Sequence, residues 1–281
     1  MRFILDTSAF IGLGRNTLTK LSNAHEFLLP PYCFWELLTH LGEKDFDREK
    51  GQILKAEFCS FLDDHGAASL QAVGDTFCLD KLKDREADTT LLRRVLRELQ
   101  NSNSLYEFYS RQFVDALGNT RQISGAVEVC KQRLAQAEDN HCRWVSALIE
   151  RIRSGETQLN SEDDIHASAC SIAHAQAKAM CHPNPDDMNV IDAYYPWALY
   201  IVLLAKRRLP RQSLPDKNDY EDALICRYIL QNTPSTIIVT NENGQRELVK
   251  QVINILDSRV AAERRCRYTV CASNDICGNV N

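Results

Sequence analysis

Residues 2–8 read RFILDTS, and the fold expected for the chain follows from this segment. An apolar run leads into Asp6 and a turn-forming pair, which predicts a short buried strand that ends in a carboxylate. A second segment of this kind lies near the other end of the chain. Residues 235–240, STIIVT, are rich in β-branched side chains, and Glu242 follows them closely. The two segments predict strands of one sheet.

Helical patterns surround these strands. Two prolines, Pro30 and Pro31, precede residues 32–41, YCFWELLTHL, whose apolar spacing predicts a helix that starts at the prolines and carries Glu36. Beyond residue 210 the patterns predict helices over residues 219–231 and 244–256 and a last strand over residues 267–271.

Between these two ends the sequence is typical of helices, and its one strand signal, at residues 67–79, is weak. A β-rich beginning and an α/β end predict one parallel sheet assembled from both chain ends. We therefore expect an α/β fold whose core is formed by residues 1–42 and 210–281. A large, mainly α-helical insertion, residues 43–209, would pack on this core. Its predicted helices cover residues 48–63, 87–100, 105–117, 126–153, 161–180 and 191–208.

The composition is that of a folded protein. Hydrophobic residues make up 44% and charged residues 25% of the 281 residues, which excludes wholesale disorder. The net charge of −5 excludes a strongly basic, nonspecific nucleic-acid binder. Eleven cysteines and a start unlike a leader favour free thiols, and we expect a cytoplasmic protein. No membrane partner is expected, because the longest apolar run, residues 197–205, is shorter than the roughly 20 residues of a spanning helix.

Acidic residues occupy positions where ligands collect. Asp6 and Glu242 follow the two strands, and in an open parallel sheet ligands bind beyond the carboxyl ends of the strands. Asp219 and Asp222 are three residues apart at a helix start, which places both on one helical face. Clustered carboxylates repel one another, and a hard divalent cation, Mg²⁺ or Mn²⁺, would neutralise them through oxygen ligands. These four acids and Glu36 are the predicted metal ligands.

The order of these motifs resembles that of PIN-domain nucleases. The resemblance implies a three-layer α/β/α parallel sheet and a metal-dependent endoribonuclease that hydrolyses RNA, similar to toxins of the VapC type. A toxin or defence role would follow from it. Matched position by position, the catalytic acids are Asp6, Glu36, Asp222 and Glu242. The motifs that carry the resemblance are FILDTS at residues 3–8, the helix with Glu36, NDYEDALI at residues 218–225 and IVTNE at residues 238–242.

Short polar side chains next to these acids would have supporting roles. In the site that the resemblance implies, Thr7, Ser8, Thr240 and Asn241 would orient carboxylates or touch phosphate. For Asn241 an equal alternative is a cap or turn of the chain. Taken singly, Asp6 is also more often a cap residue than a ligand.

A basic cluster leads into the helix with the paired aspartates. Lys206, Arg207, Arg208 and Arg211 are the predicted phosphate contacts, with a solvated face as the alternative. RNA is the expected substrate, and single-stranded DNA is a second option. An antitoxin, another protein or a second copy of the chain in a homodimer are the further partners considered.

Other functions stay open. PIN domains more often have Asp where this chain has Glu242, which favours a degenerate PIN-like module that binds RNA or protein without cutting. The length of the predicted insertion favours a helical interaction protein whose α/β part is a scaffold. A zinc site is disfavoured because His166 and His174 are eight residues apart and no CxxC pair occurs. A cysteine–histidine nucleophile stays open, although no spacing points to one.

Overall fold

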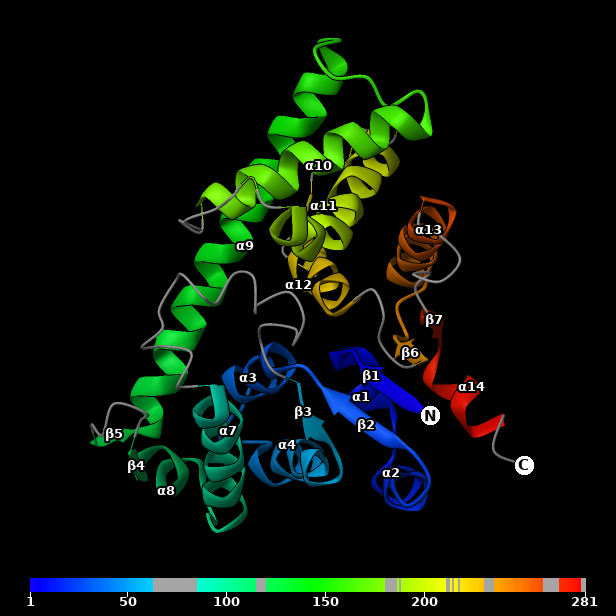
Figure 1. Cartoon of the computed structure of the whole chain (residues 1–281). Helices are drawn as coiled ribbons and strands as arrows, with labels where there is room; N and C mark the ends of the chain where they lie inside the picture. The colour runs from blue at the N-terminus through cyan, green and yellow to red at the C-terminus, as the bar shows by residue number, and fades with distance from the viewer. Residues whose placement is uncertain are drawn as a thin grey trace.

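A computed structural model describes residues 1–62, 85–114, 120–179, 186, 188–210, 213, 215–216, 218–229, 235–259 and 268–278. Within them, five short strands form one sheet in which every neighbouring pair is parallel (Figure 1). The order across the sheet is β3-β2-β1-β6-β7. The strands are β1 (Arg2–Leu5), β2 (Glu26–Leu29), β3 (Ser60–Phe61), β6 (Thr236–Val239) and β7 (Tyr268–Cys271).

Both faces of the sheet are buried. On β1, Phe3 and Leu5 belong to one hydrophobic core, while Ile4 belongs to a second core on the opposite face. This alternation follows from the two-residue period of a strand, and burial on both sides explains why the strand is apolar throughout. The chain therefore has the predicted α/β fold with a parallel sheet, and helices on both faces make it compatible with three layers.

Separate sets of helices cover the two faces. Beside Phe3 and Leu5 lie α1 (Thr7–Gly12), α2 (Arg15–Ser22), α3 (Pro31–Thr39), α4 (Phe46–Ile53) and α7 (Arg85–Gln100). Beside Ile4 lie α10 (Glu162–Ala179), α11 (Met188–Arg208) and α13 (Asn243–Arg259). The helix α9 (Ile123–Arg153) contributes side chains to both cores. The short helices α12 (Asn218–Leu224) and α14 (Ser273–Gly278) complete the part beyond residue 217.

Three long helices extend away from the sheet. In Figure 1, α9, α10 and α11 form an arm, and α11 packs against α9, α10 and α13. Residues 194–205 of α11 are all buried, which accounts for the apolar run in the sequence. Among the described residues, no helix has the length and apolar character that crossing a membrane requires.

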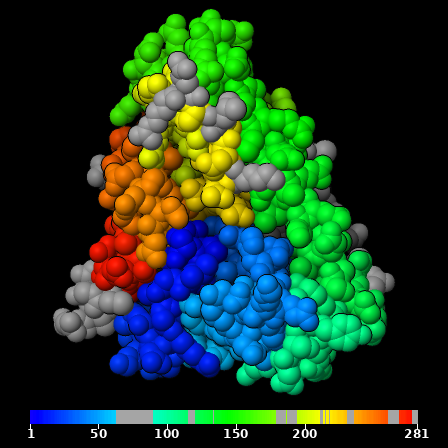
Figure 2. Space-filling model, turned by 180° about the vertical axis from the view of Figure 1, so that it is seen from behind, coloured from blue at the N-terminus to red at the C-terminus, as the bar shows by residue number. Residues whose placement is uncertain are grey.

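The two ends of the chain lie side by side, as predicted. The pairing of β1 with β6 joins Leu5 to Val239, and Figure 2 shows the first segments of the chain against the segments after residue 235. Residues within 43–209 also take part in the sheet and its cover. In this range β3 pairs with β2, and α11 packs on α13.

Local patterns gave some wrong boundaries. The helix predicted over residues 48–63 is instead α4, a 3₁₀ turn at Leu54–Phe58 and the strand β3. The helix predicted over residues 105–117 ends at Ser110, and β4 (Gln112–Val114) follows and pairs with β5 (Thr120–Gln122). The strand β2 was not predicted, because its four residues are too few to show the alternation of apolar and polar side chains that is typical of a strand. The weak strand signal at 67–79 lies outside the described residues.

Candidate carboxylate site

The candidate site lies where the strand order reverses. From β1 the chain continues towards β2 on one side, while the later strands β6 and β7 lie on the other side. Ligands of open α/β sheets bind beyond the carboxyl ends of the strands at such a switch point. Asp6 directly follows β1 and Thr240 directly follows β6, so the paired strands bring them together.

Asp6 is a buried carboxylate at the N-terminus of α1. Its Oδ2 accepts hydrogen bonds from the Ser8 hydroxyl at 2.7 Å, from the Ser8 backbone N–H at 3.4 Å and from the Thr240 hydroxyl at 3.2 Å. Burial raises the pKa of Asp6, and these hydrogen bonds oppose the rise. Asp6 is thus a helix cap, the alternative considered from the sequence, and it also belongs to the acidic group described next.

Glu36 and Glu221 form a second part of the site. The Thr7 hydroxyl donates to Glu36 Oε2 at 2.5 Å, and a further hydrogen bond joins the carboxyl groups of Glu36 and Glu221. Burial raises the pKa of Glu221 to about 8, and the charge of Glu36 adds to the rise. Two carboxyl groups that share a hydrogen bond need one proton between them. This pair therefore holds a proton at neutral pH.

Asp222 is the acid whose pKa depends on both Asp6 and Glu242. Burial raises its pKa to about 8, and the charges of Asp6 and Glu242 are the next largest causes. Glu242 itself is exposed, and its backbone N–H donates to the Thr240 hydroxyl at 3.2 Å. The charge of Asp6 also raises the pKa of Glu36, so Asp6 influences both Glu36 and Asp222, while Glu242 influences Asp222.

Asp219 has a different environment. Arg208 Nη2 lies 2.6 Å from Asp219 Oδ1, and the Asp216 backbone N–H donates to Asp219 Oδ2 at 2.8 Å. The Arg208 side chain is 17% exposed and also pairs with Asp216 at 3.2 Å. The protein's own guanidinium already neutralises Asp219, so this carboxylate does not need a metal ion.

Two residues of the predicted basic cluster, Arg207 and Arg208, make contacts within the protein. Arg207 Nη1 donates to the carbonyl of Gly244 at 2.8 Å, Arg208 pairs with Asp219, and Lys206 is exposed. Arg211 lies outside the described residues. Contact with nucleic acid stays a prediction for this cluster.

Asn241 ties three segments together. Its Nδ2 donates to the Ser8 carbonyl at 3.1 Å, and its Oδ1 accepts from the Ser273 backbone N–H at 3.0 Å and hydroxyl at 2.8 Å. Its backbone N–H donates to the Ser8 hydroxyl at 3.1 Å. These contacts fix the chain after β6, in line with the turn role considered from the sequence.

Two site residues escaped the sequence reasoning. Glu221 lies between Asp219 and Asp222 on α12, and nothing in the local sequence indicates that its side chain reaches Glu36. Gln245 is 2% exposed; its Oε1 shares the single proton of the Thr240 hydroxyl with Asp6 Oδ2, and its Nε2 donates to the Asp222 carbonyl at 3.2 Å. A glutamine on a helix gives no sign in the sequence that it will form hydrogen bonds with both Thr240 and Asp222.

The donor chemistry of the site fits a hard divalent cation. All donors are carboxylate oxygens. Burial raises the pKa of Asp6, Glu36 and Asp222, and repulsion from the charge of Asp6 adds to the rise at Glu36 and Asp222. A hard cation would favour the charged form of all three. Within the described ranges, however, no three His, Cys, Asp or Glu side chains are already spaced to hold an ion. The acidic side chains would have to move closer together to bind a metal ion.

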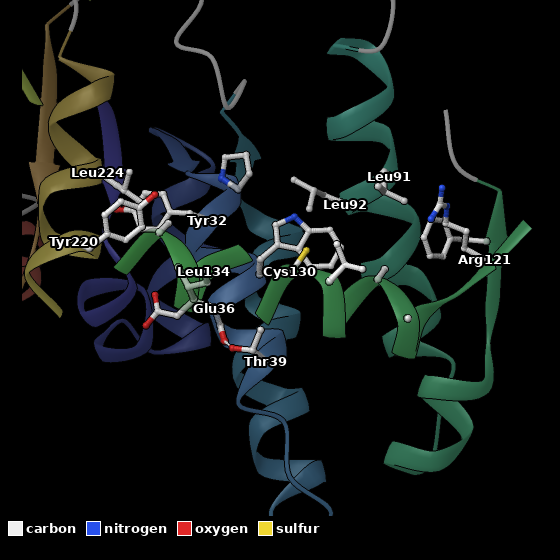
Figure 3. Close-up of a pocket in the computed structure, with 17 residues that line it drawn as sticks. Tyr32, Glu36, Thr39, Leu91, Leu92, Arg121, Cys130, Leu134, Tyr220 and Leu224 are labelled. Carbon is white, nitrogen blue, oxygen red and sulfur yellow. Dashed lines mark hydrogen bonds between the residues drawn. The ribbon is translucent and has the colours of Figure 1, made fainter. Parts of the chain in front are cut away.

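A cavity of about 580 Å³ lies beside Glu36 (Figure 3). Its walls come from α3, α7, α9, α12 and the β4–β5 hairpin, and Glu36 lies on its edge. The lining is mostly apolar and aromatic.

The fold and the site define an α/β protein with buried carboxylates at the switch point of a parallel sheet. Comparison with known proteins adds no family to this description, since no family model, no curated protein and no solved structure matches the chain.

Proposed function

We propose that the chain is a PIN-like, metal-dependent endoribonuclease. The observation that carries this proposal is the position of Asp6, Glu36, Asp222 and Glu242. They come from four separate segments, yet the charge of Asp6 raises the pKa of both Glu36 and Asp222, and the charge of Glu242 adds to the rise at Asp222. Buried acids that repel one another at the usual ligand-binding edge of a sheet cost folding free energy, which a bound cation would offset.

In this proposal Asp6, Glu36, Asp222 and Glu242 would hold Mg²⁺ or Mn²⁺. When bound, the cation would supply Lewis acidity for a hydrolytic water and for the phosphate oxygens. Ser8 and Thr240 orient the Asp6 carboxylate by hydrogen bonds from their hydroxyls. Thr7 orients Glu36 in the same way.

Binding of the cation would be coupled to the release of protons. Carboxylate ligands must be deprotonated, so loading the site would release the protons that Asp222 and Glu221 hold near neutral pH. Glu221 would then act as a positioning residue for Glu36 through their shared hydrogen bond.

A cleavage assay tests the proposal. Labelled RNA incubated with the protein and Mn²⁺ should be cut, EDTA should stop the reaction, and Asp6→Asn and Asp222→Asn should abolish it. Asp47→Asn is the matched control, because Asp47 is an exposed acid on α4, outside the site. Cleavage that persists unchanged in both site variants would disprove the assignment.

A second candidate is a module that binds RNA without cutting it. It is favoured by the lack, among described residues, of a ready-made set of three metal ligands. RNA binding without cleavage at any Mn²⁺ or Mg²⁺ concentration would support it. A toxin role, an antitoxin and a homodimer stay predictions of the resemblance.

A further inference from the structure

Gln245 occupies a buried position between two of the acidic segments. It is the third residue of α13, and both ends of its side-chain amide are engaged. Nε2 donates to the backbone carbonyl of Asp222 on α12 at 3.2 Å, and Oε1 contacts the hydroxyl of Thr240, directly after β6. A buried amide with both ends bonded fixes the separation of the two segments, because a shift of either one would leave a polar group unsatisfied.

The Thr240 hydroxyl connects this amide to the first acid of the site. It lies 3.2 Å from Asp6 Oδ2 and also contacts Gln245 Oε1, but it has a single proton to donate. The amide oxygen is thus a second acceptor for that proton. Asp6 Oδ2 could turn to a cation without leaving the buried hydroxyl unsatisfied, because Thr240 would then donate to Gln245.

We propose that Gln245 is a positioning residue of the cation site. It holds the segment with Asp222 in a fixed place relative to Asp6, and it frees Asp6 Oδ2 for the cation. This inference rests on the proposed function and adds to it a residue outside the set of cation ligands. Replacing a residue that orients metal ligands from outside typically weakens metal binding by about 10- to 100-fold.

The start of α13 is itself held in place. Arg207 Nη1, from α11, donates to the Gly244 carbonyl at 2.8 Å, and Arg246 Nη1 donates to the Thr240 carbonyl at 3.0 Å. The helix α11 also packs against both α12 and α13. Gln245 therefore projects from an anchored helix end, which a residue that positions other groups requires.

Gln245→Met tests this role, because methionine has a similar length but no amide. The matched control is Tyr268→Phe, since Tyr268 on β7 is also a buried donor to a backbone carbonyl, that of Tyr228 at 2.8 Å. Urea unfolding in EDTA would verify that both variants fold, and we expect both to be less stable than the wild type.

Titration with Mn²⁺ alone, followed by the electron paramagnetic resonance signal of the free ion, would measure the dissociation constant. We expect Gln245→Met to raise this constant about 10- to 100-fold and Tyr268→Phe to leave it unchanged. A loss of stability by itself would affect both variants alike. An unchanged constant in Gln245→Met, or an equal rise in both variants, would overturn the inference.

A double-mutant cycle tests the route through Thr240. In a Thr240→Val background the shared hydroxyl is gone, so Gln245→Met should weaken Mn²⁺ binding much less than it does in the wild type. Effects that simply multiply would show that Gln245 does not act through Thr240, and would overturn the proposed bridge.

The outcomes separate this inference from the nuclease proposal. If Gln245→Met weakens Mn²⁺ binding but the wild type cuts no RNA in Mn²⁺, the positioning role stands and the catalytic proposal fails. If the wild type cuts RNA and Gln245→Met binds Mn²⁺ normally, only the positioning role fails. A wild type that binds no Mn²⁺ would overturn both.

Discussion

The Thr240 hydroxyl lies 3.2 Å from Asp6 Oδ2, although the two residues are 234 positions apart in the sequence. The parallel pairing of β1 and β6 makes this contact, because it aligns the carboxyl ends of both strands. The same hydroxyl also contacts Gln245 Oε1 and accepts the backbone N–H of Glu242. Thr240 is therefore the junction between the first acid of the site and the segment that carries the last.

Removing this hydroxyl should destabilise the protein. In Thr240→Val the buried Gln245 amide oxygen loses its donor, and an unsatisfied buried polar group costs about 1–3 kcal/mol. Thr240→Ser keeps the hydroxyl and serves as the control. Urea unfolding at neutral pH measures both variants. Equal stability of the valine and serine variants would contradict the junction role.

Gly12, the last residue of α1, is a position where a side chain does not fit. A Cβ there would lie 2.6 Å from Asn241 Nδ2, so Gly12→Ala must displace this amide from its hydrogen bond with Ser8. We expect a loss of about 1 kcal/mol in the free energy of unfolding.

The control for this substitution is Gly51→Ala. Gly51 has open space around it, and alanine there should stabilise the helix by about 0.5–1 kcal/mol. Urea titrations of the two variants should move in opposite directions. A Gly12→Ala protein more stable than the wild type would show that the Asn241 contact contributes little.

Lys55 is a buried cation that closes the C-terminal end of α1. Its ammonium donates to the carbonyls of Phe10 at 2.7 Å, Ile11 at 3.0 Å and Leu13 at 2.7 Å, and burial lowers its pKa to about 8. Lys55→Met would leave these carbonyls without their donor, and we expect a loss of about 2 kcal/mol or more. Lys44→Met, at an exposed position, should be close to neutral. Denaturant midpoints compare the two, and similar midpoints would refute the capping role.

The acids should make the metal-free protein less stable as pH rises. The pKa of Asp222 and of Glu221 is raised to about 8, so between pH 4 and pH 8 the folded state binds more protons than the unfolded state. Their contribution is therefore complete below about pH 4 and is lost as pH rises through about 8. In EDTA, the free energy of unfolding should therefore fall as pH rises over this range.

Two measurements check the cause of this pH dependence. Asp222→Asn has no charge to bury, so its stability should change less with pH than that of the wild type. Mn²⁺ should restore stability at high pH, because a ligand that binds only the folded state stabilises it. A wild-type protein whose stability rises from pH 5 to pH 8 in EDTA would contradict the raised pKa values.

Much of the candidate site was predictable because its signals are local. A strand that ends in Asp6, a helix that carries Glu36 and a strand followed by Glu242 each appear within a few residues, and adjacent parallel strands align their ends. The helical spacing of Asp219 and Asp222 was also correct, but it could not reveal that Arg208 neutralises one of them. Glu221 lies between them and instead contacts Glu36 on a distant helix.

Local patterns along the chain were enough to predict the alternation of strands and helices, a parallel sheet that joins the two chain ends, and acids at the strand ends. These features follow from periodicity and from the order of residues along the chain. Other features became apparent only from the folded chain. They are the carboxylates that shift one another's pKa, the places of β2 and β3 in the sheet, and the cavity beside Glu36. Such features depend on contacts between segments far apart in the chain, and the burial that shifts a carboxylate's pKa exists only after those segments have packed.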